Sequence, residues 1–289
     1  MDKILSGKTV AIDIKRQIKS YTEELKASGK SLKISSILVG DDGGSVYYQN
    51  FQEKLANNLG IDFEKIKLDE SISEENLKLK IEELNKDDSV NGIMLLLPLP
   101  KHIDERSVTN LIDADKDLDC LSEVSVGRFY KGEKCFMPCT PNSVITLLKA
   151  YNIEIEGKEV VIIGRSNIVG KPLFQMFLNE NATVTVCHSR TKNLKEVCKR
   201  ANILVVAIGR ANFIDSSYVR EGAVVIDVGT SEVNGKITGD VNFDDVYEKA
   251  SLITPVPGGV GSLTTTLLLK NVCKELDYNE TKDIICWWS

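Results

Sequence analysis

The chain has 289 residues, of which 42% are hydrophobic and 27% are charged, and its formal net charge is −6. This length allows two domains, and an acidic balance without a basic block argues against nucleic acid as a partner. No apolar run approaches the roughly 20 residues of a membrane span, and the N-terminus lacks the apolar core of a signal peptide. We therefore expect a cytoplasmic protein with no membrane partner.

The first half of the chain predicts helices that alternate with strands. Helical spacing of apolar residues predicts helices at 8–27, 46–59 and 73–85. Short apolar runs predict strands at 34–39, 63–68 and 90–97. Ser45 is the expected N-cap of the second helix, which Gly60 ends, and Thr140-Pro141 begins a helix that leads into the second half.

The second half contains the most informative stretch, Gly157–Pro172, which reads GKEVVIIGRSNIVGKP. A β-branched strand ends at Gly164, and a loop bounded by Gly170 opens into a helix, an arrangement that can hold a phosphate. The loop is not G-x-G-x-x-G, because Ser166 stands at the second glycine, and any tight turn between strand and helix also favours glycine. Further strands are expected at 182–186, 203–208 and 223–228, with helical residues at 174–178. This alternation predicts a doubly wound parallel sheet.

The strand expected at 182–186 is followed by Cys187-His188-Ser189-Arg190. A domain that binds NAD usually carries an acidic residue near this strand end, for the ribose hydroxyls. A cation and hydroxyls suit a 2′-phosphate instead, so the sequence favours NADP; the alternative is that Arg190 is only a solvated loop charge. The predicted cofactor-binding residues are Gly164, Arg165, Ser166, Val169, Gly170, Pro172, His188, Ser189, Arg190, Ile208, Gly209 and Thr230.

The chain has seven cysteines and two histidines. None of the cysteines forms C-x-x-C, and Cys135 and Cys139, four residues apart, have no second pair and no nearby histidine. Reduced and mostly buried thiols are therefore expected, with no metal site. The last helix is expected at 262–276. The tail 279–289, which ends Ile-Ile-Cys-Trp-Trp, is expected to cap an apolar surface, and the alternative is that it binds a partner.

Five stretches in this order resemble one family. They are PLPKHID from Pro98, Lys116-Asp117-Leu118-Asp119, Pro138-Cys139-Thr140-Pro141, Gly164–Pro172 and Thr254–Gly261, which contains PVPGGVG. Together they resemble the bifunctional methylenetetrahydrofolate dehydrogenase/methenyltetrahydrofolate cyclohydrolase family, over nearly the whole chain.

The resemblance implies a two-domain α/β homodimer. Residues 1–140, with the returning segment 262–289, would form the folate-binding catalytic domain, and 141–261 a Rossmann-like NADP domain. The family oxidises 5,10-methylenetetrahydrofolate with NADP and hydrolyses the methenyl product to 10-formyltetrahydrofolate. By resemblance, Tyr48, Gln52 and Asp119 occupy the catalytic positions. The implied substrate-binding residues are Tyr48, Gln52, Leu96, Pro98, Leu99, Asp119, Pro257, Gly258 and Gly259.

The chain departs from the family pattern mainly at folate-side positions. Gln52 stands where the family has a catalytic lysine, four residues after Tyr48 and so on the same helix face. Lys54 is two residues further and faces away, because two residues turn a helix by roughly 200°. Leu96 replaces the glutamine that partners the family lysine. The other departures are Cys120-Leu121 for Gly-Phe, Ser143 for Gly and Ser262-Leu263 for Pro-Met.

These departures are expected to affect the cyclohydrolase activity more than the dehydrogenase activity. Hydrolysis of the methenyl cation needs a proton acceptor that a glutamine amide does not supply, whereas hydride transfer is mostly positioning. An NADP-dependent dehydrogenase with weak or lost cyclohydrolase activity is therefore expected. The alternative is a catalytically lapsed homologue that binds nucleotide or another ligand. A different Rossmann oxidoreductase is a weaker reading, because it leaves PVPGGVG unexplained.

Overall fold

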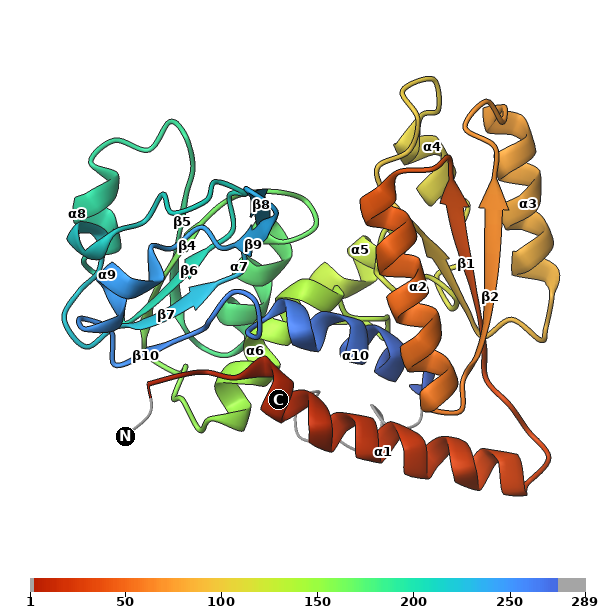
Figure 1. Ribbon diagram of the computed structural model, residues 1–289, viewed down its shortest axis with the longest axis horizontal. Coiled ribbons are helices and arrows are strands. Elements are labelled where there is room, and N and C mark those ends of the chain that lie inside the picture. Colours follow the sequence, from red (N-terminus) through yellow and green to blue (C-terminus); the bar gives the residue numbers. More distant parts are fainter. Residues whose placement is uncertain (1–2, 275–289) are drawn as a thin grey trace. The chain divides into compact units, whose positions relative to one another are not determined.

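The computed structural model describes residues 3–274, which divide into two compact units (Figure 1). The three-stranded unit comprises Ile14–Met137 and the described part of Leu268–Ser289, and the five-stranded unit comprises the described part of Met1–Asp13 and Pro138–Leu267. The division falls inside two helices, α1 (Gly7–Ala27) and α10 (Gly261–Val272). It differs from the predicted boundaries at the N-terminus, because Ile4 bridges Ile253 and the Leu5 N–H donates to the Ile253 carbonyl at 2.8 Å.

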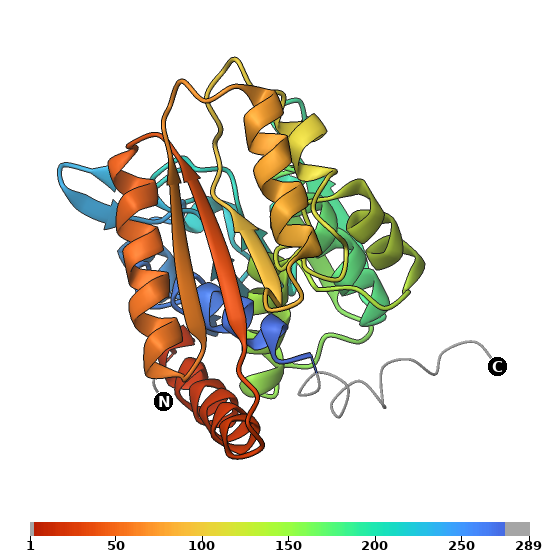
Figure 2. The same ribbon diagram turned by 90° about the vertical axis from the view of Figure 1, so that its right-hand side faces the viewer.

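The three-stranded unit is built on a parallel sheet of order β2-β1-β3 (Figure 2). Its strands are β1 (Lys33–Val39), β2 (Asp62–Leu68) and β3 (Gly92–Leu95). Alternate residues of a strand point to opposite faces. Ile37 and Val39 therefore meet the apolar side of α3 (Glu74–Lys86), whereas Ser36 on the other face bonds to α2 (Gly43–Asn58). The two helices cover opposite faces of the sheet.

The sequence analysis did not predict α4 (Glu105–Thr109) or α5 (Glu123–Lys131) in the three-stranded unit. Both are too short for a clear apolar period, although each begins at a polar cap, Asp104 and Ser122 respectively. The predicted N-cap of α2 was wrong by three residues. Asp42 is the cap, and its carboxylate accepts from the Ser45 N–H at 2.8 Å.

The five-stranded unit contains a parallel sheet of order β10-β7-β6-β4-β5, the doubly wound arrangement that the alternation predicted. Its strands are β4 (Glu159–Ile163), β5 (Thr183–Cys187), β6 (Ile203–Val206), β7 (Val224–Asp227) and β10 (Leu252–Ile253). Its helices are α6 (Cys139–Ala150), α7 (Gly170–Asn179), α8 (Leu194–Cys198), the 3-10 helix η1 (Ser216–Tyr218) and α9 (Phe243–Tyr247).

Helices cover both faces of this sheet. Val161 and Ile163 of β4 belong to an apolar core with Cys198 of α8 and Val246 of α9. On the other face α7 packs against β4, β5 and α6, as Figure 1 shows. Strands β6 and β7, and β4 after its first residue, are buried on both faces, which is why they read as continuous apolar runs in the sequence.

A small antiparallel hairpin joins β8 (Ser231–Val233) to β9 (Lys236–Thr238). Asn234 and Gly235 form its turn with φ angles of 51° and 74°, the positive values that a two-residue hairpin turn requires. The Asn-Gly dipeptide is the sequence signal for such a turn.

The last helix is described only from Gly261 to Val272, so the predicted tail 279–289 lies outside the described residues. Within residues 3–274, no helix has the length and apolar character needed to cross a membrane. Six cysteines of this part are free thiols, and Cys286 lies beyond it.

Candidate active site and nucleotide site

Helix α2 carries two of the predicted catalytic residues, Tyr48 and Gln52, one turn apart. Tyr48 is half-buried, whereas Gln52 has no exposed surface. Lys54 is exposed, as the helical geometry predicted. No lysine on α2 therefore occupies the position at which the resemblance expects the catalytic ammonium group.

Two glutamines on α2 are buried but differ in their hydrogen bonds. Gln49 Nε2 donates to the Ser36 carbonyl and to Ser36 Oγ, both at 3.0 Å. Neither Gln52 Nε2 nor Gln52 Oε1 has a hydrogen-bond partner among residues 3–274. A buried polar group without a partner costs about 1–3 kcal/mol, so the Gln52 amide is an uncompensated polar group beside Tyr48.

The segment after β3 contains three predicted substrate-binding residues. Leu96 is 8% exposed, and its N–H donates to the Ile37 carbonyl of β1 at 3.0 Å. Leu99 is half-buried and Pro98 is exposed. The segment begins at the carboxyl end of β3, the sheet edge where ligands bind in open α/β folds.

Asp119 lies in a turn that a second aspartate holds in place. The buried Asp117 carboxylate accepts from the Leu121 N–H at 2.9 Å and from the Ser122 N–H at 2.8 Å. Cys120 has a φ of 56°, the left-handed conformation that glycine adopts most easily, and this accounts for the glycine that the family pattern expects there. Sequence reasoning missed the positioning role of Asp117, which its place in Lys-Asp-Leu-Asp suggests only weakly.

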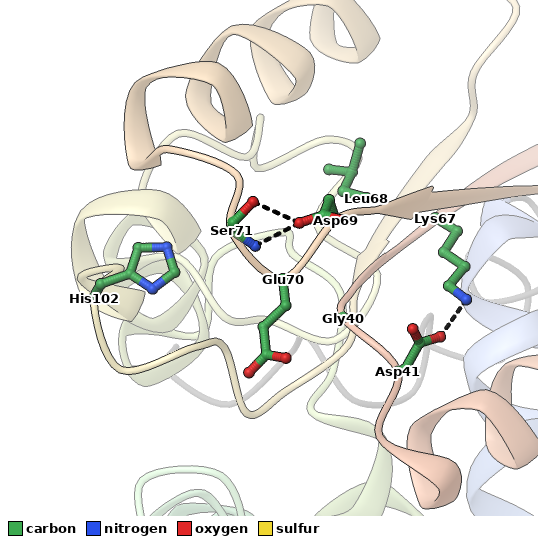
Figure 3. A pocket seen from close by; sticks show the side chains of 8 residues that line it. All are labelled: Gly40, Asp41, Lys67, Leu68, Asp69, Glu70, Ser71 and His102. Atoms are coloured by element: carbon green, nitrogen blue, oxygen red, sulfur yellow. Dashed lines mark hydrogen bonds and ion pairs between the residues drawn. The ribbon is translucent and has the colours of Figure 1, made fainter.

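An open hollow of about 770 Å³ lies beyond the carboxyl ends of β1 and β2 (Figure 3). Its polar groups are paired locally: Asp41 with Lys67, Asp69 with Ser71, and His102 Nε2 with the Ile72 carbonyl at 2.9 Å. None of the predicted site residues lines it. The hollow is therefore not the predicted folate site.

The glycine-bounded loop connects β4 to α7, as predicted. A Cβ on Gly164 would lie 2.2 Å from the Ala207 carbonyl oxygen, and one on Gly170 would lie 2.2 Å from the Gly164 carbonyl oxygen. Only glycine allows these close backbone approaches. Ser166 Oγ accepts from the Val169 N–H at 3.1 Å, which gives a physical role to the residue that replaces the second glycine.

The remaining loop residues suit a phosphorylated ligand. Arg165 and Ser166 are exposed, while Gly170 and Pro172 are buried at the first turn of α7. At the end of β5, Ser189 and Arg190 are exposed, and the Arg190 N–H donates to His188 Nδ1 at 3.1 Å. Residues 187–192 contain two cations and no carboxylate. A helix N-terminus, exposed cations and this missing acid fit a dinucleotide with an additional phosphate.

Two buried aspartates that sequence reasoning missed shape the loops after β6 and β7. The Asp240 carboxylate accepts from the N–H groups of Ile208, Gly209 and Arg210 at 2.7, 3.0 and 2.6 Å. Asp227 accepts from the Gly229, Asp240 and Val241 N–H groups at 3.1, 3.0 and 2.9 Å. Burial raises the pKa of Asp227 to about 7, against the lowering effect of these N–H groups. Of the predicted cofactor residues, Ile208 and Gly209 are thus held by Asp240, and Thr230 is exposed.

The predicted substrate-binding residues Pro257, Gly258 and Gly259 belong to the five-stranded unit, and the others to the three-stranded unit. The Gly258 carbonyl accepts from the Gly7 N–H at 3.0 Å, and a Cβ on Gly7 would lie 2.1 Å from the Gly259 carbonyl oxygen. The start of α1 therefore packs directly on this loop. One departure from the family pattern, Ser143, lies on α6, where its Oγ donates to the Cys139 carbonyl at 2.8 Å and contacts Thr264 Oγ1 of α10 at 3.2 Å.

Among residues 3–274 there is no cluster of histidine, cysteine and carboxylate side chains that could hold a metal ion.

Comparison with known proteins identifies both units. The family model "Tetrahydrofolate dehydrogenase/cyclohydrolase, catalytic domain" matches residues 5–119, and "Tetrahydrofolate dehydrogenase/cyclohydrolase, NAD(P)-binding domain" matches residues 138–280. The bifunctional protein FolD of Clostridium perfringens is 99% identical over 277 residues, which are 96% of this chain and 100% of that protein.

Solved structures agree. The bifunctional methylenetetrahydrofolate dehydrogenase/cyclohydrolase of Campylobacter jejuni superimposes with a TM-score of 0.93 at 43% identity, covering 96% of this chain and 99% of that one. The Trypanosoma brucei enzyme, complexed with NADP cofactor and an inhibitor, gives a TM-score of 0.90 at 34% identity, covering 97% and 99%. With its catalytic domain and its NAD(P)-binding domain both present, the chain belongs to the tetrahydrofolate dehydrogenase/cyclohydrolase family.

Proposed function

We propose that this chain oxidises 5,10-methylenetetrahydrofolate to the methenyl form with NADP, and that its hydrolysis of the methenyl product is weak. The observation that carries the second half is Gln52. Its amide is buried, lacks a partner among residues 3–274, and stands where the family pattern has a catalytic lysine. The nucleotide loop, by contrast, keeps the glycines that its geometry requires.

The dehydrogenase half depends on positioning. NADP, when bound, accepts the hydride from the methylene carbon. Tyr48 is proposed to pack against the pterin, and the Asp119 carboxylate to accept hydrogen bonds from the pterin amino group and the ring N–H beside it. Neither role needs a proton acceptor of tuned pKa, so the replacement of lysine by Gln52 leaves this step possible.

The hydrolase half needs a group that takes a proton from the attacking water. A glutamine amide does not take up a proton at physiological pH. Leu96, which stands where the family pattern has the glutamine that partners the lysine, has an apolar side chain and cannot act as a proton acceptor either. The loss of an acid–base group typically lowers a rate by about 10²–10⁴-fold. A contact between Gln52 and folate also needs a different side-chain rotamer, because the amide has no exposed surface.

The choice of NADP is supported by Arg165, Ser189 and Arg190, all exposed next to the loop and strand end that would face the adenosine ribose. The 2′-phosphate of NADP carries the charge that two arginines attract, while NAD would gain little from them.

We also propose a homodimer, as the resemblance implies. Light scattering coupled to size-exclusion chromatography tests this proposal, and a monomeric mass would refute it.

The test of the function uses two absorbance signals in one reaction. Purified protein, methylenetetrahydrofolate and NADP are expected to give reduced nicotinamide, and the methenyl product is expected to accumulate because its removal is slow. Absence of nicotinamide reduction at high enzyme concentration would refute the dehydrogenase. Methenyl decay as fast as its formation would refute weak hydrolysis.

A catalytically lapsed homologue is the second candidate, and the closed, solvent-inaccessible Gln52 amide favours it. Such a protein binds NADP but neither binds nor turns over the folate substrate. Calorimetric titration with each ligand separates the two candidates, because folate binding is expected only of the enzyme.

A further inference from the structure

Two cysteines from different segments of the chain lie side by side in the three-stranded unit. Cys120 occupies the turn that carries Asp119, and Cys135 follows α5, 15 residues later. The two thiols share a hydrogen bond. No sequence motif predicts this pair, because its spacing matches neither C-x-x-C nor a metal site.

Two side chains from the end of the described chain hold the segments of Cys120 and Cys135 together. Asn271 Nδ2 donates to the Leu118 carbonyl at 2.8 Å and to the Met137 carbonyl at 3.2 Å, so it bridges the two segments. Lys274 Nζ donates to the Asp115 carbonyl at 2.7 Å and lies 5.5 Å from the centre of the Phe136 ring. Asn271 and Lys274 therefore hold the backbone segments that carry the two thiols next to each other.

The two thiols differ in access and in acidity. Cys120 is 5% exposed, whereas Cys135 is half-buried and can be reached by a small molecule. The hydrogen bond from Cys120 and the positive charge of Arg128 lower the pKa of Cys135, while the same hydrogen bond and burial raise the pKa of Cys120. Because the thiolate is the nucleophile, Cys135 is the attacking sulfur of the pair.

We propose that Cys120 and Cys135 are a reversible disulfide site that small-molecule disulfides oxidise, and that its closure weakens folate binding. The Cys135 thiolate attacks one sulfur of the small disulfide, forms a mixed disulfide and releases one thiolate. Cys120 then loses its proton, attacks Cys135 Sγ and expels the second thiolate. The net reaction oxidises two protein thiols and reduces one small disulfide to two thiols, which take up the protons.

Closure acts on the folate site through Asp119. An S–S bond of about 2.05 Å is much shorter than a hydrogen-bonded sulfur contact, so the turn that contains Cys120 must shift. Asp119 is the preceding residue, and the Cys120 N–H bonds the Asp117 carbonyl at 3.1 Å. This consequence rests on the proposed role of Asp119 in pterin binding.

The first test maps the disulfide without any activity measurement. The reduced full-length protein is incubated with oxidised glutathione, alkylated and digested, and its peptides are identified by mass spectrometry. A Cys120–Cys135 cross-link is expected. Cys187 and Cys198 serve as internal controls, because burial raises the pKa of Cys187 and raises that of Cys198 to about 12; both are expected to stay reduced. No cross-link, or a link from either cysteine to a different one, would overturn the proposal.

The second test measures the effect on substrate. Oxidation of the wild type is expected to raise KM for methylenetetrahydrofolate by about tenfold, with little change in KM for NADP, and dithiothreitol is expected to restore it. Cys135→Ser is expected to keep the KM of the reduced wild type for methylenetetrahydrofolate, and this KM is expected not to change on oxidation. Cys120→Gly, which suits the positive φ, is expected to do the same. An equal response in Cys135→Ser would overturn the regulatory role.

Asp119→Asn in the reduced protein separates the two proposals. An unchanged folate KM in this variant would refute the role of Asp119 in pterin binding, while a mapped Cys120–Cys135 cross-link would still establish the disulfide site. A cross-link without any KM change in the wild type would refute the coupling alone.

Discussion

Each of the two units buries polar side chains, but the units satisfy them differently. In the five-stranded unit, the buried Asp240 carboxylate accepts three backbone N–H groups and shapes the loop after β6. In the three-stranded unit, the buried Gln52 amide has no partner among the described residues. A buried polar group that holds a loop is part of the fold, whereas one without a partner marks a position whose surroundings are set for a different side chain or a ligand.

This contrast agrees with the distribution of departures from the family pattern. The nucleotide loop keeps Gly164 and Gly170, because a Cβ at either position would collide with backbone. On the folate side, Gln52 and Leu96 both differ from the family pattern. Backbone contact requires the two glycines of the nucleotide loop, whereas the positions of Gln52 and Leu96 carry no such backbone requirement.

The largest expected effect comes from restoring the family residues. Gln52→Lys with Leu96→Gln is expected to raise methenyl hydrolysis by about 10²-fold or more, whereas Gln52→Lys alone gives a small gain, because a buried ammonium group lacks an acceptor. The measurement is the decay of methenyl-folate absorbance. Lys54→Gln is the matched control and should change nothing, because Lys54 is exposed. Additive gains in the double variant would refute the pairing.

Removal of the Asp240 carboxylate tests whether a hydrogen-bonded buried group stabilises the five-stranded unit. Asp240→Ala leaves three N–H groups without their acceptor and is expected to lower the free energy of unfolding by about 3 kcal/mol. It is also expected to weaken NADP binding, because Ile208 and Gly209 lose their anchor. Chemical denaturation and calorimetry measure the two effects. Asp244→Ala, on α9, is a suitable surface control; equal losses in both variants would contradict a special role for Asp240.

The two glutamines of α2 sharpen the contrast within one helix. Gln52→Leu is expected to stabilise the protein by about 1–2 kcal/mol, because it removes an unpartnered amide. Gln49→Leu is expected to destabilise it by a similar amount, because Ser36 loses both bonds from Nε2. Thermal unfolding of the pair gives the sign directly, and a loss of stability in Gln52→Leu would mean that the amide has a partner in solution.

Arg190→Ala tests the cofactor assignment. The exposed guanidinium group is expected to bind the 2′-phosphate, so its removal should raise KM for NADP by about tenfold and leave KM for NAD nearly unchanged. Initial rates with both cofactors measure this. Lys192→Ala, a nearby exposed cation, is the control for general electrostatics, and an equal rise for NAD would contradict the assignment.

The effect of pH is the most gradual. Because the folded-state pKa of Asp227 is about 7 and its ordinary value is 3.8, the folded state holds the proton longer than the unfolded state. Stability from this group is therefore greatest at low pH and falls between about pH 4 and pH 7, by about 1 kcal/mol per pH unit. Urea unfolding of the wild type and of Asp227→Asn gives the difference in slope; identical slopes would contradict the shift.

The sequence by itself determined the doubly wound sheet and the nucleotide loop. Buried parallel strands read as unbroken apolar runs, and Gly164 and Gly170 are required by local backbone geometry, so both signals lie within short stretches of chain. Helical spacing placed Gln52 on the same face as Tyr48, and its assignment to the catalytic position is what the family resemblance implies. Short elements such as α4 and the role of Ser166 as acceptor for the Val169 N–H were not predicted, because they depend on single hydrogen bonds.

Tertiary structure alone decided which polar groups are satisfied and which thiols meet. Asp227 and Asp240 are ordinary acidic residues in the sequence, and only the packing of the loops after β6 and β7 buries them among N–H groups. Cys120 and Cys135 become a pair because Asn271, far along the chain, bonds both segments. Such contacts join residues whose separation along the chain carries no periodic signal, so they become visible only once the fold brings them together.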